Sequence, residues 1–257
     1  MTTNFEKFKE LHYRKNLFVL PNAWNPKSAL LFQEKGFPAI ATSSAAVATS
    51  LGYEDGEGMP LDDYLFIIKR ILNTVKIPVT VDFEMGYGKT NRQIAENIQK
   101  LVELGVSGIN IEDSVIINAK RSLKDSNEFA KTIVHIKNHL AAKNLSIFIN
   151  IRCDTYILNV TNKQSETSDR LRIYETTGAD GIFLPCISNE NDIAAAVRKT
   201  KLPISVMCIP NLPDFDKLNE LGVKRASMGP FMFNKVYNNA GELCQMISDK
   251  KSFSPII

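Results

Sequence analysis

The chain has 257 residues, a length that is typical of one α/β barrel domain and sufficient to bury a large core. Hydrophobic residues make up 44% and charged residues 23%, and the formal net charge of +3 is spread without a basic block, which argues against a nucleic-acid partner. No stretch approaches the roughly 20 apolar residues of a membrane span, and residues 1–15 lack the apolar core of a signal peptide, so we expect a cytoplasmic protein without a membrane partner.

Short apolar runs alternate with amphipathic segments along the whole chain. Eight runs have the character of strands buried on both faces, as in a parallel sheet, and predict strands at 17–20, 39–41, 77–82, 108–111, 146–151, 181–184, 202–207 and 225–228. Helical periodicity between them predicts helices near 26–36, 61–74, 91–105, 126–143, 164–177, 189–199, 212–221 and 231–248. Four junctions carry the glycine that commonly closes a helix: Gly36, Gly105, Gly178 and Gly222.

Eight alternations of strand and helix without a linker predict a single domain, residues 1–257, of the α/β class with the architecture of a (β/α)8 TIM barrel. The alternative is a doubly wound open sheet. Such a sheet would normally carry a Gly-rich phosphate-binding loop after an early strand, and the sequence has none.

The ends of the predicted strands are the candidates for the active site, because a barrel builds its active site at the C-terminal ends of its strands. Acidic residues gather after three neighbouring strands: Asp55 after the second, Asp82 and Glu84 after the third, and Glu112 after the fourth. Converging carboxylates need a cation, and oxygen-only ligands favour Mg2+, with Mn2+ as the alternative, over Zn2+. Because Mg2+ keeps several waters, we expect one or two of these residues to bind it directly.

Two further strand ends predict a small carboxylate as the partner. Arg152 follows the fifth strand, where it can hold a substrate carboxylate through two parallel hydrogen bonds; the alternative is a structural ion pair. The backbone amides around Ser43, Ser44 and Ala45, after the second strand, are expected to bind the other end of the anion.

The sequence lacks, at its predicted strand ends, the residues that two other barrel chemistries need. No predicted strand ends in a lysine, which disfavours a Schiff-base aldolase. None of the three histidines lies at the end of a predicted strand, which disfavours a zinc hydrolase: His12, His135 and His139.

These motifs, in this order and spacing, resemble the isocitrate lyase/phosphoenolpyruvate mutase superfamily, in its phosphonomutase-like branch, over nearly the whole chain. The matching segments are 21–24, 42–44, 50–56, 81–88, 108–113, 150–154 and 178–183. The resemblance implies that Mg2+ lies near Asp82, with Asp55, Glu84 and Glu112 around it through water. The usual second acid of the metal site is aspartate, whereas Glu84 is one methylene longer.

The same resemblance implies how the substrate is held. Arg152 would bind the substrate carboxylate, and Ser43 with its neighbours would bind an oxyanion of a small 2-oxo or enol acid. The first matching segment adds Trp24 to the substrate-binding residues. Members of the superfamily cleave C–C or P–C bonds beside a carbonyl, or rearrange phosphoenolpyruvate, through an enolate that the metal stabilises.

The stretch 116–123, which follows the fourth strand, departs from the superfamily and leaves the reaction open. The lyases carry a catalytic cysteine there, and this chain has none. Asn118, Lys120 and Ser122 are residue types that the mutases use, in an altered order, and are therefore the candidate catalytic residues. The resemblance thus implies a lyase or hydrolase acting on an oxaloacetate- or phosphonopyruvate-like acid; the alternatives are a phosphoenolpyruvate phosphomutase and a catalytically silent barrel that binds a small acid.

The resemblance also implies an assembly in which the eighth helix is exchanged between subunits. The C-terminal helix and tail, about residues 231–257, would then pack on a partner subunit, and the tail is unusually apolar. We therefore expect a homodimer or homotetramer.

Overall fold

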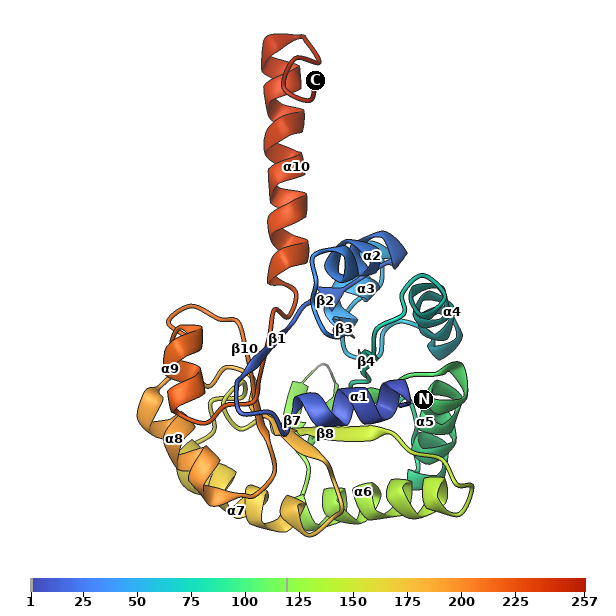
Figure 1. Ribbon diagram of the computed structural model, residues 1–257, viewed down its shortest axis with the longest axis vertical. Helices are drawn as coiled ribbons and strands as arrows, with labels where there is room; N and C mark the ends of the chain where they lie inside the picture. The colour runs from blue at the N-terminus through green and yellow to red at the C-terminus, as the bar shows by residue number, and fades with distance from the viewer. Residues whose placement is uncertain (1, 119) are drawn as a thin grey trace.

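A computed structural model of the protein describes residues 2–118 and 120–257. Ala119, which belongs to the stretch 116–123, lies outside the described residues. Helices surround a curved parallel sheet, and the last helix stands away from this body (Figure 1).

The central sheet has the strand order β1-β11-β10-β9-β8-β5-β4-β3-β2, with every neighbouring pair parallel. Its strands are β1 (Phe18–Leu20), β2 (Asn22–Ala23), β3 (Ile40–Thr42), β4 (Val79–Asp82), β5 (Gly108–Glu112), β8 (Phe148–Arg152), β9 (Gly181–Phe183), β10 (Ile204–Met207) and β11 (Arg225–Ser227). Only Pro21, which has no N–H to donate, separates β1 from β2, so these two together occupy the position of the first strand, of which the prediction at 17–20 covered β1. Because β1 pairs with β11 and β2 with β3, the sheet closes on itself, and the predicted barrel is confirmed.

Eight helices follow the strands as predicted: α2 (Pro26–Glu34), α4 (Leu61–Leu72), α5 (Asn91–Leu104), α6 (Ser126–Ala141), α7 (Lys163–Glu175), α8 (Glu190–Lys199), α9 (Phe215–Glu220) and α10 (Phe231–Lys250). The helix predicted at 212–221 begins later, because the Asp214 side chain accepts a hydrogen bond from the amide of Lys217 and caps the helix there. None of the helices in the described part of the chain combines the length and the apolarity needed to cross a membrane.

A helix that was not predicted, α1 (Asn4–Leu11), closes the N-terminal end of the barrel. Its Phe8 side chain is fully buried, with its ring centroid 5.4 Å from that of Phe148 and 6.5 Å from that of Phe18. A Cβ atom at Gly108 would lie 2.6 Å from the Phe8 ring, so the glycine leaves the space that this ring fills. Phe18, Gly108 and Phe148 each begin a strand, which leaves the opposite end of the barrel open for the site.

Two further elements at that opposite end were also missed. Helix α3 (Ser44–Ser50) directly follows β3, and an antiparallel hairpin of β6 (Ser114–Ile117) and β7 (Lys120–Leu123) follows β5. The hairpin occupies the stretch that the sequence left as a loop.

Candidate active site

Two of the predicted metal ligands, Asp55 and Asp82, meet at one hydroxyl group. Asp82 ends β4, Ser44 begins α3, and Asp55 lies in the loop between α3 and α4. The Ser44 Oγ lies 3.2 Å from Asp55 Oδ1 and 3.1 Å from Asp82 Oδ2. Because a hydroxyl has a single proton to donate, it can satisfy only one of these carboxylates at a time.

The surroundings of Asp82 fix it in place. Asn110 Nδ2 lies 3.5 Å from Asp82 Oδ1, and the hydroxyl of Tyr64 donates to the Asp82 carbonyl at 2.9 Å. Burial raises the pKa of Asp82; the positive charge of Arg152 opposes this shift, and the negative charge of Asp55 adds to it. The aspartate pair is therefore a place where a cation would relieve repulsion.

Glu84 turns away from this pair. Its carboxylate accepts hydrogen bonds from the backbone amides of Gly56 at 2.8 Å and Glu57 at 3.1 Å, and from the Tyr87 hydroxyl at 2.5 Å. Burial raises the pKa of Glu84 to about 8, although the Tyr87 hydrogen bond opposes the shift. The two backbone donors were not foreseen, because they belong to a loop 27 or more residues earlier in the chain.

Glu112 is fully buried at the end of β5 and is neutralised by two arginines. Its Oε2 lies 3.0 Å from Arg152 Nη1, and its Oε1 accepts a hydrogen bond from Arg121. Burial raises the pKa of Glu112 to about 7, and both guanidinium groups counteract that rise. Glu112 thus belongs to an ion-pair network and not to the aspartate pair.

Asp154, which was not predicted as a site residue, completes this network. Arg152 Nε donates to Asp154 Oδ1 at 2.6 Å, and Arg121 Nη1 lies 3.5 Å from Asp154 Oδ2. Two carboxylates and two guanidinium groups therefore share the barrel mouth, and Arg152 makes ion pairs there. The available sequence signal for Asp154 was its position two residues after Arg152, at the end of a strand.

The hairpin explains why Arg121 points into the site, whereas the predicted catalytic residues Lys120 and Ser122 do not. Directly opposed residues of an antiparallel pair share a face, and Arg121 opposes Ile116 whereas Lys120 opposes Ile117. Arg121 faces Glu112, and Lys120 and Ser122 lie exposed on the other face. Successive side chains of a strand point to opposite faces. Had this alternation been applied to the stretch, it would have placed Arg121 on the face opposite Lys120 and Ser122.

Asn118, the third predicted catalytic residue, is exposed in the turn of the hairpin and has a φ of 49°. The structure does not bring Asn118 to the carboxylates of the site. Ser114, at the other end of the hairpin, is the residue near them, with its Oγ 3.4 Å from Glu112 Oε1.

The predicted anion-binding segment lies beside the aspartate pair. Ser43 caps α3, and its Oγ accepts from the amide of Ala46. The amides of Ser44 and Ala45 are the first two of the helix and have no intrahelical acceptor. Trp24, in contrast, is packed in the core: its side chain is 7% exposed, and its ring centroid lies 5.3 Å from that of Phe233.

The four predicted carboxylate ligands therefore do not form one cluster. Within residues 2–118 and 120–257, no three His, Cys, Asp or Glu side chains converge as metal ligands. Uncompensated carboxylates repel one another, and Glu84 and Glu112 each have their own donors instead. The remaining pair, Asp55 and Asp82, fits Mg2+, which uses one or two carboxylates and keeps several waters.

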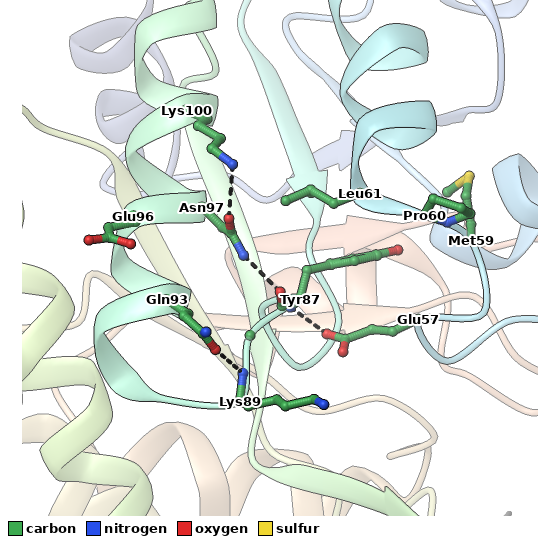
Figure 2. A pocket seen from close by; sticks show the side chains of 11 residues that line it. Glu57, Met59, Pro60, Leu61, Tyr87, Lys89, Gln93, Glu96, Asn97 and Lys100 are labelled. Atoms are coloured by element: carbon green, nitrogen blue, oxygen red, sulfur yellow. Dashed lines mark hydrogen bonds between the residues drawn. The ribbon is translucent and has the colours of Figure 1, made fainter.

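A cavity of about 670 Å³ lies between α5 and the loops that precede α4 and α5 (Figure 2). Glu57 and Tyr87 form part of its wall, and Lys89 and Lys100 stand at its edge. Its described lining residues include neither Asp55 nor Asp82, so it is separate from the aspartate pair.

Comparisons with known proteins identify relatives along nearly the whole chain. Residues 8–248 match the model of the phosphoenolpyruvate phosphomutase family. An uncharacterized protein of Mycobacterium tuberculosis is 34% identical over 242 residues, which cover 94% of this chain and 89% of that protein. The 2-methylisocitrate lyase of Escherichia coli is 28% identical over 213 residues, covering 81% of this chain and 69% of the lyase. The crystal structure of a Burkholderia cenocepacia protein named for an inferred phosphonomutase activity has a TM-score of 0.89 and 31% identity, and covers 94% of this chain and 99% of that one.

Proposed function

Because the chain belongs to the phosphoenolpyruvate phosphomutase family, we propose that it is a Mg2+-dependent lyase or hydrolase of a small 2-oxo acid. The reaction would cleave a C–C or P–C bond next to the carbonyl of an oxaloacetate- or phosphonopyruvate-like substrate. The observation that carries the proposal is the pair Asp55 and Asp82, which share one hydroxyl at the open end of the barrel. Mn2+ is the alternative ion.

The residues around the aspartate pair have separate roles in this reaction. Bound at Asp55 and Asp82, Mg2+ would supply the positive charge that stabilises the oxyanion developing on the substrate carbonyl. The amides of Ser44 and Ala45 would donate hydrogen bonds to the substrate anion. Arg152 would bind the substrate carboxylate, exchanging part of its ion pairing with Asp154 for the substrate.

The specific reaction can be decided by offering three substrates. The protein is incubated with Mg2+ and oxaloacetate, phosphonopyruvate or phosphoenolpyruvate, and pyruvate and the phosphorus NMR signals are followed. Release of pyruvate from either oxo acid supports the proposal. Interconversion of phosphonopyruvate and phosphoenolpyruvate would instead make the protein a mutase, and Mg2+-dependent binding without turnover would make it a silent barrel.

The metal part of the proposal has its own test. Calorimetric titration of Mg2+ into the wild type and Asp82→Ala should show binding that the substitution abolishes, because Asp82 is the less exposed member of the pair. Equal affinity in the two proteins would contradict the proposed site.

A further inference from the structure

Two loops at the barrel mouth are joined by reciprocal hydrogen bonds, in which a glutamate of each loop accepts from backbone amides of the other. Residues 51–60 connect α3 to α4, and residues 83–90 connect β4 to α5. Glu84 of the second loop accepts from the amides of Gly56 and Glu57 in the first, at 2.8 and 3.1 Å. In return, Glu57 accepts from the amide of Tyr87 at 2.6 Å, as Figure 2 shows. We call these four residues, Gly56, Glu57, Glu84 and Tyr87, the loop clasp.

The loop clasp holds a backbone conformation that is costly without it. Glu57, Glu84 and Tyr87 have φ values of 63°, 48° and 55°, in the left-handed region that side chains other than glycine adopt at a cost. Glu84 is only 3% exposed, and the Tyr87 hydroxyl donates to the same carboxylate. Each carboxylate therefore compensates backbone amides that the unusual conformation directs toward it.

A second anchor fixes the clasp to the barrel. Asn97 of α5 donates from its side-chain amide to the Tyr87 carbonyl at 2.7 Å, and Lys100 donates to Asn97 at 3.3 Å (Figure 2). The clasp is thus supported from α5, on the side of the cavity described above.

The position of the clasp in the chain gives it a consequence for the site. Asp55 directly precedes Gly56, and Asp82 lies two residues before Glu84. The hydrogen bonds between the loops therefore connect the backbone next to one aspartate with the backbone next to the other. We propose that Glu84 is a positioning residue that sets the separation of Asp55 and Asp82, and is not itself a ligand of the cation. This inference rests on the proposed function, because the cation is part of it.

The two roles of Glu84 predict opposite orders for two substitutions. Glu84→Gln keeps an oxygen that accepts from both amides, so Mg2+ affinity measured by calorimetry should stay within about threefold of the wild type. Glu84→Asp keeps the carboxyl group, but its side chain is one methylene shorter and does not reach both amides, and loss of these hydrogen bonds should weaken Mg2+ binding by about tenfold or more. A ligand would show the reverse order, with the aspartate variant binding and the glutamine variant failing, and that result would overturn the proposal.

Glu57 provides a second test that removes neither aspartate. Glu57→Ala breaks the clasp from the other loop and should weaken Mg2+ binding about fivefold. The matched control is Glu54→Ala, which removes an exposed carboxylate from the same loop and should change the affinity less than twofold. Equal effects of the two substitutions on Mg2+ affinity would contradict the positioning role of the loop clasp. This comparison does not depend on Glu84→Asp and remains decisive if that variant does not fold.

The wild type separates the failure of this inference from that of the proposed function. If the wild type binds no Mg2+ and cleaves none of the three acids, both are overturned. If it binds Mg2+ and releases pyruvate while Glu84→Gln abolishes metal binding, the proposed function stands and only the positioning role is overturned.

Discussion

Arg152 bridges two carboxylates with two different nitrogens of its guanidinium group. Its Nη1 lies 3.0 Å from Glu112 Oε2, and its Nε donates to Asp154 Oδ1 at 2.6 Å, whereas the single nitrogen of a lysine cannot reproduce this planar arrangement. Arg152→Lys keeps the charge but should lower kcat/KM at least about thirtyfold, because loss of a charge-assisted contact to the substrate carboxylate costs about 2–4 kcal/mol. Mg2+ affinity should hardly change, because the arginine is not a ligand.

Activity and thermal stability measured on the same sample distinguish the two roles of Arg152. A clamp for the substrate lowers the activity of each folded molecule. A purely structural ion pair would lower the melting temperature and leave the activity per folded molecule intact, which would contradict the proposed role.

Glu84 should make the stability of the protein depend on pH. Burial raises its pKa to about 8, so the folded state keeps this proton at pH values where the unfolded chain, with a pKa of about 4.5, has released it. The folded state then binds more protons, and the free energy of unfolding falls as the pH rises from about 4.5 to about 8. Urea unfolding without Mg2+ at intervals across this range measures the fall. Glu84→Gln has no proton to release and should reduce the slope, while Glu112, whose pKa burial raises to about 7, still contributes to it. An unchanged slope would contradict the assignment to Glu84.

The position of a residue at the barrel mouth was easier to predict than the direction in which its side chain points. The structure brings Asp55 and Asp82 together at the mouth, because Asp82 ends β4 and the loop after α3 places Asp55 beside it. The direction of Glu84 was not predictable, because it depends on the amides of Gly56 and Glu57 in another loop. Arg121 was missed because its stretch was treated as a loop, in which side chains have no fixed alternation.

At the scale of whole elements, the prediction succeeded where the pattern was local. The strands and the helices between them follow from apolar runs and periodicity, which depend on neighbouring residues alone. Helix α1 was missed although it is amphipathic: Phe8 and Leu11 are buried and pack against the distant strands β1 and β8. The hairpin β6–β7 was missed because its stretch was treated as a loop, and ion pairs of Arg121 with Glu112 and Asp154 hold it in place.

Arg121 should anchor this hairpin over the barrel mouth. It pairs with Glu112 and Asp154, and its Nη1 donates to the Ser114 hydroxyl at 2.8 Å. Arg121→Gln removes the charge from contacts that are about four-fifths buried, so amide hydrogen exchange in residues 114–123 should become about tenfold faster. Ser122→Ala on the exposed face is the control and should leave exchange unchanged. Equal protection in both variants would show that the hairpin is held by other contacts.

At the scale of the whole molecule, α10 is the element that the barrel does not explain. It extends away from the body in Figure 1, and among its residues only Phe233 is buried. Apolar side chains along it stay exposed: Val236 by 45%, Tyr237 by 53%, Leu243 by 37% and Met246 by 42%. Apolar surface on this scale is typical of an interface and not of a free helix in water.

The exposed face of α10 leads to a prediction about assembly. We expect a dimer or tetramer in which α10 and the tail, with Phe253 67% exposed, pack on a partner subunit, since burial of apolar surface is the main driving force of association. Light scattering coupled to gel filtration at micromolar concentration should therefore give a mass of at least twice 28.8 kDa. The double substitution Tyr237→Glu and Leu243→Glu places charges on that face and should shift the protein toward the monomer, whereas Lys69→Glu on the outer surface of α4 should not. A wild-type mass of about one chain would contradict the exchange of α10 between subunits.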